Sequence, residues 1–264
     1  MSDNGQAVLK TDKATIRFGG LIAVNELDMA VKKGEIYGLI GPNGAGKTTI
    51  FNLLTGVYKP TSGSIHFQQE RIDGLRPYQI ASKGISRTFQ NIRLFPQMTA
   101  YENVELGLHN TPRYTLAEAF LRTPRAQRIE ADTRRKAHEL LELVNLEEHA
   151  DKRASSLPYG LQRRLEMARA MAARPDLLLL DEPAAGMNED ECEELIQLIR
   201  RIHDEKQYAM IMIEHHMKVV MDLCTGSRIY VLNLGSFLAV GSPEEIQSSP
   251  DVIKAYLGER KNGR

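Results

Sequence analysis

Residues 41–49 read Gly-Pro-Asn-Gly-Ala-Gly-Lys-Thr-Thr and match the phosphate-loop pattern G-x-x-x-x-G-K-[ST] at every defined position. Glycines in this pattern let the backbone wrap closely around phosphate oxygens, and the positive end of the following helix dipole adds to the attraction. Lys47 is expected to reach the terminal phosphates, and Thr48 a magnesium ion. The sequence therefore predicts a nucleoside triphosphate site whose binding residues are Gly41, Pro42, Asn43, Gly44, Ala45, Gly46, Lys47, Thr48 and Thr49.

The loop is flanked by a strand pattern and a helix pattern. Upstream, residues 35–40 (Glu-Ile-Tyr-Gly-Leu-Ile) form a short apolar run of strand character that ends directly on Gly41. Downstream, residues 48–54 carry several apolar side chains and stop at Gly56. The order strand, glycine loop, helix is the context that the phosphate-loop pattern requires.

Composition narrows the class of protein. The chain has 264 residues, of which 42% are apolar, enough for a single α/β unit with an appended subdomain. Lys plus Arg equals Asp plus Glu at 34 each, so we expect no nucleic-acid partner.

The two cysteines and the hydropathy pattern concern the location of the chain. Cys192 and Cys224 lack metal-ligand spacing and indicate idle thiols in a reducing cytosol. With no leader pattern and no run of roughly 18 apolar residues, we expect a soluble, unprocessed chain that can still dock on a membrane protein.

The first part of the chain has the pattern of a small β subdomain followed by helices. Short β-like pieces at residues 14–18, 27–31 and 64–67 predict an antiparallel sheet beside the phosphate loop. A strand over residues 85–89 leads into Gln90, and residues 98–108 and 116–146 are helical in character. We expect the β subdomain within residues 8–90 and an inserted helical subdomain at residues 91–174.

From residue 161 on, helices and strands alternate. The pattern predicts helices at residues 161–173 and 191–204, strands at 177–180 and 209–213, and a hairpin of strands 228–232 and 236–239. This alternation argues for an α/β fold with a mostly parallel sheet covered on both faces. Residues 175–264 are therefore expected to complete the core and to add a C-terminal extension, within one domain over residues 1–264.

Residues 177–182 (Leu-Leu-Leu-Leu-Asp-Glu) form an apolar run that ends in two carboxylates. A strand buried on both faces has such a run, and ligands of open α/β sheets collect at the carboxyl ends of strands. Asp181 is expected to meet the magnesium ion held by Thr48, and Glu182 to orient and deprotonate a water molecule. The alternative is that this acidic pair caps the following helix; the phosphate loop favours the catalytic interpretation.

Several motifs together resemble an ATP-binding cassette (ABC) domain over nearly the whole chain. These are residues 41–49, Gln90, residues 157–164 (Leu-Pro-Tyr-Gly-Leu-Gln-Arg-Arg), residues 181–183 (Asp-Glu-Pro) and His215. More narrowly, residues 17–21, 157–160, 181–188 and 250–258 resemble the longer of the paired ATPases of bacterial high-affinity branched-chain amino acid importers. The resemblance implies a P-loop NTPase fold of ABC type: a mostly parallel core sheet flanked by helices, an antiparallel β subdomain and an inserted helical subdomain.

The resemblance also implies roles for single residues. Phe18 would stack on adenine with Val24 near the sugar and base, since an aromatic ring accepts any π face; ordinary core packing is the alternative for Phe18. Gln90 would touch magnesium and water, and His215 would contact the γ-phosphate. The implied catalytic residues are Lys47, Gln90, Glu182 and His215, and the implied magnesium ligands are Thr48, Gln90 and Asp181.

The signature segment departs from the general family form, Leu-Ser-Gly-Gly-Gln. Residues 157–161 read Leu-Pro-Tyr-Gly-Leu, so Pro158 removes a hydroxyl that would donate to the γ-phosphate. Gly160 keeps its backbone N–H at the start of a helix, where the helix dipole still favours an anion. Tyr159 and Gly160 are the expected nucleotide contacts here, and the Pro-Tyr-Gly form is interpreted as a mark of the branched-chain subfamily. His216 and Asn188 stand where many relatives have Asp.

In the family, ATP is held between the phosphate loop of one subunit and the signature segment of another. The resemblance therefore implies ATP and Mg²⁺ as cofactors and a second ABC ATPase as partner, with a heterodimer favoured over a homodimer. It also implies transmembrane permease subunits and, indirectly, a periplasmic or surface substrate-binding protein. The chain would lie peripherally on the cytoplasmic face of the bacterial inner membrane.

Basic residues gather between Arg113 and Lys136, including Arg122, Arg125, Arg128, Arg134 and Arg135. One interpretation is a solvated helical face. The other is a contact with the permease or with anionic lipid.

Other functions fit part of the pattern. The ATPase of another ABC transporter, such as a lipopolysaccharide exporter, shares the layout but usually keeps the Ser-Gly-Gly signature. A soluble cassette ATPase acting on DNA or ribosomes usually has tandem cassettes, long coiled coils or basic surfaces. A catalytically inactive binding module is opposed by Lys47, Asp181 and Glu182. The transported substrate stays open, because selectivity resides in other chains.

Overall fold

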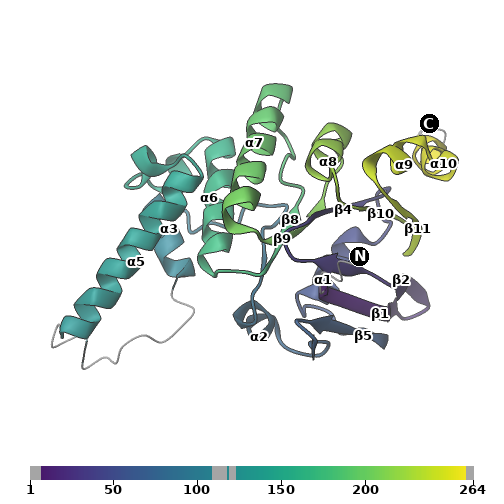
Figure 1. The fold of residues 1–264 in the computed structure, drawn as a ribbon, viewed down its shortest axis with the longest axis horizontal. Coiled ribbons are helices and arrows are strands. Elements are labelled where there is room, and N and C mark those ends of the chain that lie inside the picture. The colour runs from purple at the N-terminus through teal and green to yellow at the C-terminus, as the bar shows by residue number, and fades with distance from the viewer. Residues whose placement is uncertain (1–6, 109–117, 119–122, 260–264) are drawn as a thin grey trace, which may run out of the picture. The chain divides into compact units, whose positions relative to one another are not determined.

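The computed structural model describes residues 7–108, 118 and 123–259. The chain divides into two compact units, one made of residues 1–87 and 176–264 and the other of residues 88–175. Both are shown in Figure 1.

The first unit is built on a mainly parallel sheet. Among the described residues its strand order is β11-β10-β4-β9-β8-β7, and only the β10–β11 pair is antiparallel. The strands are β4 (Ile36–Ile40), β7 (Ile85–Arg87), β8 (Leu177–Asp181), β9 (Ala209–Ile213), β10 (Ile229–Asn233) and β11 (Ser236–Gly241). Every residue of β4, β8 and β9 is buried, as their continuous apolar runs predict. The predicted parallel sheet and C-terminal hairpin are confirmed.

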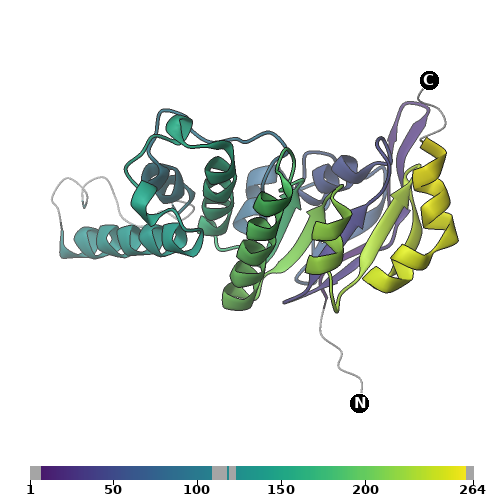
Figure 2. The same ribbon diagram turned by 90° about the horizontal axis from the view of Figure 1, so that it is seen from above.

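Helices cover both faces of this sheet. Figures 1 and 2 show α7 (Glu189–Lys206) and α8 (Met217–Leu223) on one face, and Figure 1 shows α1 (Lys47–Leu54) on the other. Because successive side chains of a strand point to opposite faces, Leu177 and Leu179 of β8 join the core cluster that also contains Phe51 of α1. The other helices of the unit are α2 (Pro77–Ser82), α9 (Pro243–Ser248) and α10 (Pro250–Glu259).

The start of α7 decides between two interpretations of the acidic pair at residues 181–182. Asn188 is the N-cap of α7: its Oδ1 accepts a 2.9 Å bond from the N–H of Glu191, whose carboxylate accepts the N–H of Asn188 in return at 2.9 Å. This capping box satisfies the first turn of the helix. Asp181 and Glu182 therefore do not cap α7.

A second, antiparallel sheet packs in the same unit. It contains β1 (Ala7–Phe18), β2 (Leu21–Leu27), β3 (Ala30–Lys32), β5 (Ser62–Phe67) and β6 (Glu70–Arg71). Strand β1 pairs antiparallel with β2, β3 and β5. Residues of β1, β5 and α1 share one buried cluster with alternate residues of the parallel sheet, so α1 lies between the two sheets.

The strand predicted at residues 27–31 is wrong in its middle. Strand β2 ends at Leu27 and β3 begins at Ala30. The hydroxyl of Thr11 donates to the carbonyl of Leu27 at 2.7 Å and accepts the N–H of Met29 at 2.8 Å. The Thr11 hydroxyl therefore supplies hydrogen bonds to the backbone between β2 and β3, where strand-to-strand bonds are interrupted. Strand propensity alone does not predict this interruption.

The predicted strand at residues 85–89 ends two residues early. Arg87 is the last residue of β7 and pairs with Leu179 of β8. Beyond it, the N–H of Phe89 donates to the carboxylate of Glu166 at 3.3 Å and no longer belongs to a ladder. Gln90 consequently lies in a loop and not at a strand end.

The second unit is helical. It contains α3 (Ala100–Gly107), α5 (Pro124–Leu143), α6 (Tyr159–Ala172) and the short 3₁₀ segments η1 (Glu147–His149) and η2 (Ala154–Ser156). The three α-helices pack against one another. Within the helix predicted over residues 116–146, Glu118 is helical and α5 covers Pro124–Leu143. Thr123 caps α5 by accepting the N–H of Ala126 at 3.3 Å, and proline favours the first helical position. Residues 116, 117 and 119–122 lie outside the described residues.

Helix α6 begins two residues before the predicted start at Leu161. Pro158 is its N-cap, and its carbonyl accepts the N–H of Gln162 at 3.0 Å. Leu165, Ala168 and Ala172 lie on one side of this helix and are buried. No helix among the described residues combines the length and the apolar character that a membrane crossing needs.

Candidate active site

The loop at residues 41–49 joins β4 to α1, as its pattern predicts. Gly41, Gly44 and Gly46 have φ values of 151°, 76° and 108°, which favour glycine. A Cβ atom on Gly41 would lie 2.1 Å from the carbonyl oxygen of Leu232, and one on Gly46 would lie 2.6 Å from that of Ala23. The path of the loop therefore excludes side chains at these positions.

Lys47 curls back into the loop. Its Nζ donates to the carbonyl of Gly41 at 2.7 Å and to that of Pro42 at 2.9 Å, and the residue is only 6% exposed. The ammonium group is thereby held inside the curve of the loop, close to the N-terminus of α1. A fixed positive charge at this place is suited to a phosphate group.

A pocket of about 210 Å³ opens over the loop. Its lining consists of Asn43, Gly44, Ala45, Gly46, Lys47, Thr48, Thr49, Glu182 and His215. The structure therefore brings the phosphate loop together with two residues that lie far away in the sequence. Both were predicted as catalytic.

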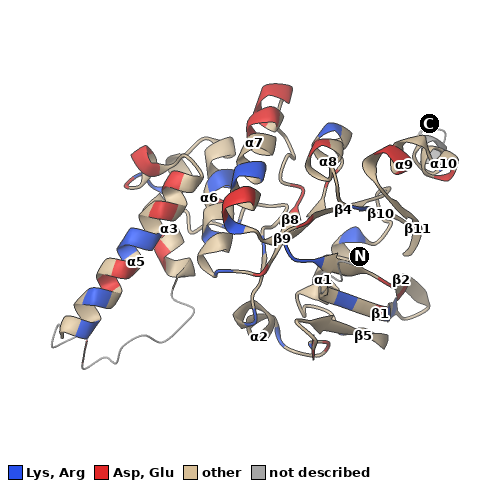
Figure 3. Cartoon of the chain, viewed as in Figure 1, with Lys and Arg blue, Asp and Glu red and all other residues tan. Residues whose placement is uncertain are grey.

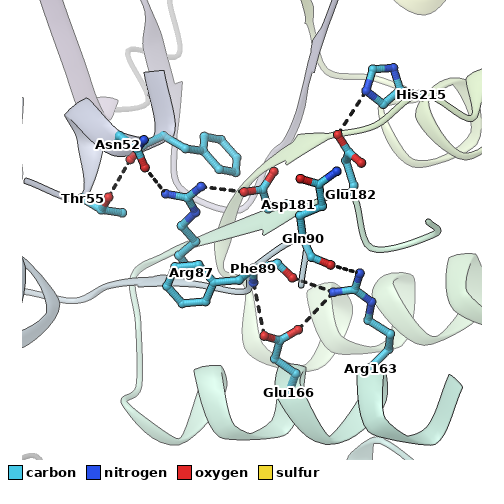
Figure 4. A network of polar contacts seen from close by, with 11 residues as sticks. Asn52, Thr55, Arg87, Phe89, Gln90, Arg163, Glu166, Asp181, Glu182 and His215 are labelled. Carbon is cyan, nitrogen blue, oxygen red and sulfur yellow. Dashed lines mark hydrogen bonds and ion pairs between the residues drawn. The ribbon is translucent and has the colours of Figure 1, made fainter. Parts of the chain in front are cut away.

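Glu182 and His215 touch each other at this pocket. Nε2 of His215 lies 3.1 Å from Oε1 of Glu182 (Figure 4). Glu182 has a φ of 49°, in the left-handed region. A non-glycine residue in such a conformation costs of order 1–3 kcal/mol and persists only where the surrounding structure holds it. The unusual backbone turns the chain away from β8 immediately after Asp181.

Asp181 is buried and paired with a residue that the sequence did not single out. One of its carboxylate oxygens lies 2.6 Å from the guanidinium of Arg87, which also donates to Oδ1 of Asn52 at 2.8 Å (Figure 4). The guanidinium stands 5.3 Å from the ring centre of Phe51. Arg87 thus connects β7, β8 and the helix of the phosphate loop. A signal was present, since an arginine in a buried strand requires a partner.

The oxygen donors at this site fit a magnesium ion bound together with phosphate. Among the described residues, no group of three or more His, Cys, Asp or Glu side chains could hold a metal by itself. Magnesium usually keeps only one or two protein ligands and completes its shell with water and substrate phosphates. The Asp181 carboxylate and the Thr48 hydroxyl are donors of that type.

Phe18 and Val24, the two residues expected to contact the adenine and the sugar of the nucleotide, differ in exposure to solvent. Phe18, at the end of β1, is 46% exposed and meets Tyr58 edge to face with ring centres 5.1 Å apart. The core-packing alternative for Phe18 is therefore wrong, and the ring has a free surface. Val24 is fully buried, and a Cβ on Gly46 would lie 3.6 Å from its Cγ2. Val24 therefore packs beneath the surface next to Gly46 of the phosphate loop, and it offers no surface to a nucleotide.

In the helical unit, a buried ion pair organises the segment around Gln90. Arg163 of α6 donates to the carbonyl of Phe89 at 2.6 Å and to that of Gln90. It also lies 3.2 Å from Glu166, whose other carboxylate oxygen accepts the N–H of Phe89 at 3.3 Å (Figure 4). The same oxygen accepts the N–H of Arg93 at 3.2 Å. Burial raises the pKa of the Glu166 carboxyl, although these donors oppose the shift. The sequence analysis included Arg163 in the signature segment but assigned no role to it, and it did not single out Glu166.

The signature segment presents an open surface. Tyr159 is 47% exposed, and its hydroxyl accepts a bond from Arg163 at 3.0 Å. A Cβ placed on Gly160 would have no atom within 4 Å. Both residues stand in the first turn of α6.

The ABC transporter sequence family matches residues 24–185 of the chain. The chain is also 48% identical to the high-affinity branched-chain amino acid transport ATP-binding protein LivG of Salmonella typhimurium, over 96% of this chain and 99% of that protein. The chain belongs to the ABC transporter family. The ABC ATPase fold, ATP as the nucleotide and transport-coupled ATP hydrolysis as the activity follow from this membership.

Further matches are consistent with this assignment. Residues 238–262 of the cassette match the family described as branched-chain amino acid ATP-binding cassette transporter. The ADP conformation of the cassette MJ1267 has a TM-score of 0.82 at 26% identity, over 96% of this chain and 99% of that one. A dimeric post-hydrolysis state of the cassette MJ0796 with ADP and Pi has a TM-score of 0.73 at 25% identity, over 89% and 98%.

Several basic residues between Arg113 and Lys136 pair with acidic neighbours. Figure 3 shows basic and acidic residues alternating along α5. Arg135 pairs with Asp132 at 2.6 Å and also with Glu139, Lys136 pairs with Asp132, and Arg125 lies 3.0 Å from Glu118. These contacts favour a solvated helical face. Arg113 and Arg122 lie outside the described residues.

Proposed function

We propose that this chain is the ATP-hydrolysing subunit of an importer for branched-chain amino acids. The observation that carries the substrate class is the match of residues 238–262 to the branched-chain cassette family, beyond the general ABC match. Near-complete, 48% identical alignment with LivG adds to it. The match of residues 238–262 favours this function over a lipopolysaccharide exporter ATPase and over a cassette that acts on nucleic acid or ribosomes.

In the proposed reaction, the chain holds ATP at the phosphate loop, and Lys47 neutralises the terminal phosphates. Glu182 orients a water molecule and takes its proton as the water attacks the γ-phosphorus, and the bond from the γ-phosphorus to ADP breaks. The 3.1 Å contact with His215 keeps the Glu182 carboxylate facing the pocket. Mg²⁺, when bound to Thr48, Asp181 and phosphate oxygens, would neutralise the charge that develops on the phosphates. Phe18 would stack on adenine, and Gln90 would contact the attacking water and the metal.

A complete site requires a second cassette in this proposal. The exposed Tyr159 and the open space around Gly160 support a role for the first turn of α6 in meeting the ATP of a partner subunit. Pro158 supplies no hydroxyl there, so backbone N–H groups and the helix dipole would act alone. A different ATPase as partner is favoured. Permease subunits, an external substrate-binding protein and a location at the cytoplasmic face of the inner membrane complete the proposal.

Purification of the tagged chain from native membranes tests this function. We expect mass spectrometry of the purified complex to identify a second ATPase and permease subunits. After reconstitution with its binding protein, the complex should take up labelled leucine, isoleucine or valine only with ATP, and the Glu182→Gln complex should not. Purification with ribosomes or nucleic acid, or uptake that ignores these amino acids, would contradict the proposal.

A further inference from the structure

Glu214 is a buried acid between the two catalytic loops. It follows the last residue of β9 directly, immediately before His215, and is 1% exposed. The neighbouring strand β8 pairs with β9 up to its own end, where Asp181 stands opposite Ile213. The loops that carry Glu182 and His215 therefore start side by side, and Glu214 lies where both loops leave the sheet.

Three backbone N–H groups converge on the Glu214 carboxylate. Oε1 accepts the N–H of Ala184 at 2.7 Å, from the loop that follows Glu182. Oε2 accepts the N–H of His215 at 2.8 Å and that of His216 at 3.1 Å. Each oxygen therefore holds a different loop, and one carboxylate joins them. Hydrogen bonds to an ionised acceptor are about twice as strong as neutral ones, particularly away from water.

The contacts made by Glu214 fix the backbone from which the catalytic side chains extend. The N–H of Glu182 donates to the carbonyl of Ile213 at 2.9 Å, so the loop that carries Glu182 is attached to β9 at Glu182 itself. The bond from Ala184 to Glu214 attaches the loop again at Ala184. His215 is anchored through its own N–H, and its ring then lies 3.1 Å from Glu182.

We infer that Glu214 is a positioning residue for hydrolysis, which sets the distance between Glu182 and His215 by tying their loops together. Glu214 is not among the residues that line the pocket, and it acts through the backbone of both loops. The inference rests on the proposed roles of Glu182 and His215. Geometric errors of about 1 Å at reacting groups can cost on the order of 10²-fold in rate.

The carboxylate is needed because all three of its partners are donors. A glutamine has the same size, but one of its two polar groups is an NH₂ that cannot accept an N–H. In Glu214→Gln either Ala184 or the pair His215 and His216 would face that donor, and one loop would be released. Glu214→Asp keeps both acceptors but has a shorter reach, so it should retain more activity than Glu214→Gln.

Steady-state ATP hydrolysis by the full-length chain in its purified complex tests the inference. We expect Glu214→Gln to lower kcat roughly 10- to 100-fold with the Kd for ATP changed less than about 3-fold, and Glu214→Asp to recover part of the rate. Glu205→Gln, an exposed residue on α7 paired with Arg201, is the matched control and should leave kcat unchanged. Because Glu214 acts through Glu182, adding Glu214→Gln to Glu182→Gln should slow hydrolysis by less than about 3-fold.

The outcomes separate the inference from the function on which it rests. If Glu182→Gln hydrolyses ATP at the wild-type rate, the proposed catalytic role of Glu182 fails. If Glu182→Gln is slow but Glu214→Gln keeps the wild-type kcat, only the positioning role fails. Equal losses from Glu214→Gln in both backgrounds, or a parallel loss of ATP binding and of the melting temperature without recovery by Glu214→Asp, would make Glu214 a purely structural residue.

Discussion

The Nε2 atom of His215 lies 3.1 Å from Oε1 of Glu182, although the two residues are 33 positions apart in the chain. Their strands, β9 and β8, are neighbours in the sheet and end at the same level, with Ile213 opposite Asp181. A carboxylate and a histidine in contact beside a phosphate loop form an arrangement suited to activating water.

Replacement of Glu182 by Gln should separate ATP binding from hydrolysis. The amide keeps the size of the side chain but cannot accept the proton of water, so we expect turnover to fall roughly 10²- to 10⁴-fold. ATP binding should persist because the loop at residues 41–49 is unchanged. Phosphate release under single-turnover conditions measures the first effect, and equilibrium titration with labelled ATP measures the second. Unchanged turnover would refute the role of Glu182.

Lys47→Ala should weaken nucleotide binding itself. The Lys47 ammonium is held inside the loop by the carbonyls of Gly41 and Pro42, where it can meet phosphate oxygens without reorganisation. Loss of a charged hydrogen-bond donor costs about 1.5–3 kcal/mol, which corresponds to roughly 10- to 100-fold in Kd. A fluorescence titration with an ATP analogue checks this value. Lys59→Ala, an exposed lysine outside the pocket lining, is the control and should bind normally.

The sequence was sufficient wherever the signal is local. The glycine loop, the apolar run of β8 and the limits of β9 follow from residues within a few positions of each other. The break between β2 and β3 was missed because it depends on the hydroxyl of Thr11, which is distant in sequence. The early end of β7 was missed because the partner of Phe89 is Glu166, on a helix formed much later in the chain.

The sequence did not reveal Arg87 and Glu214, which hold the site residues in place, for a related reason. Arg87 matters because β7 lies beside β8, and Glu214 matters because β8 lies beside β9. The alternation of strands and helices predicts a parallel sheet but not the order of its strands. Motifs therefore located the groups that face the pocket, whereas the groups that hold them required the strand order β4-β9-β8-β7.

Arg87→Ala should destabilise the chain through Asp181. The side chains of this pair are 7% and 4% exposed, so Arg87→Ala removes a cationic partner from a buried carboxylate. Breaking a buried pair in this way costs about 3–5 kcal/mol. We expect Asp181→Asn to restore much of the lost stability when added to Arg87→Ala, because the amide carries no charge. Urea unfolding of the two single variants and the double variant, without nucleotide or metal, measures the coupling. Additive losses would contradict the pairing.

The two cysteines should be inert in the folded protein. Burial raises the pKa of the Cys224 thiol to about 12, and burial together with the charge of Glu214 raises that of Cys192. Since the thiolate is the reactive form, only about one Cys224 in 10⁴ would be ionised at pH 8, whereas an ordinary thiol with a pKa near 8.5 would be ionised in about one molecule in four.

Titration with 5,5′-dithiobis(2-nitrobenzoic acid) tests this expectation. The native chain should release little chromophore, and both thiols of the sequence should react within minutes in guanidinium chloride. Raising the pH from 7 to 9 should leave the native reaction slow, since the pKa of Cys224 stays above this range, whereas the reaction of free cysteine should accelerate. Rapid reaction of either thiol in the native chain would mean that α7 or the end of α8 opens readily and exposes Cys192 or Cys224.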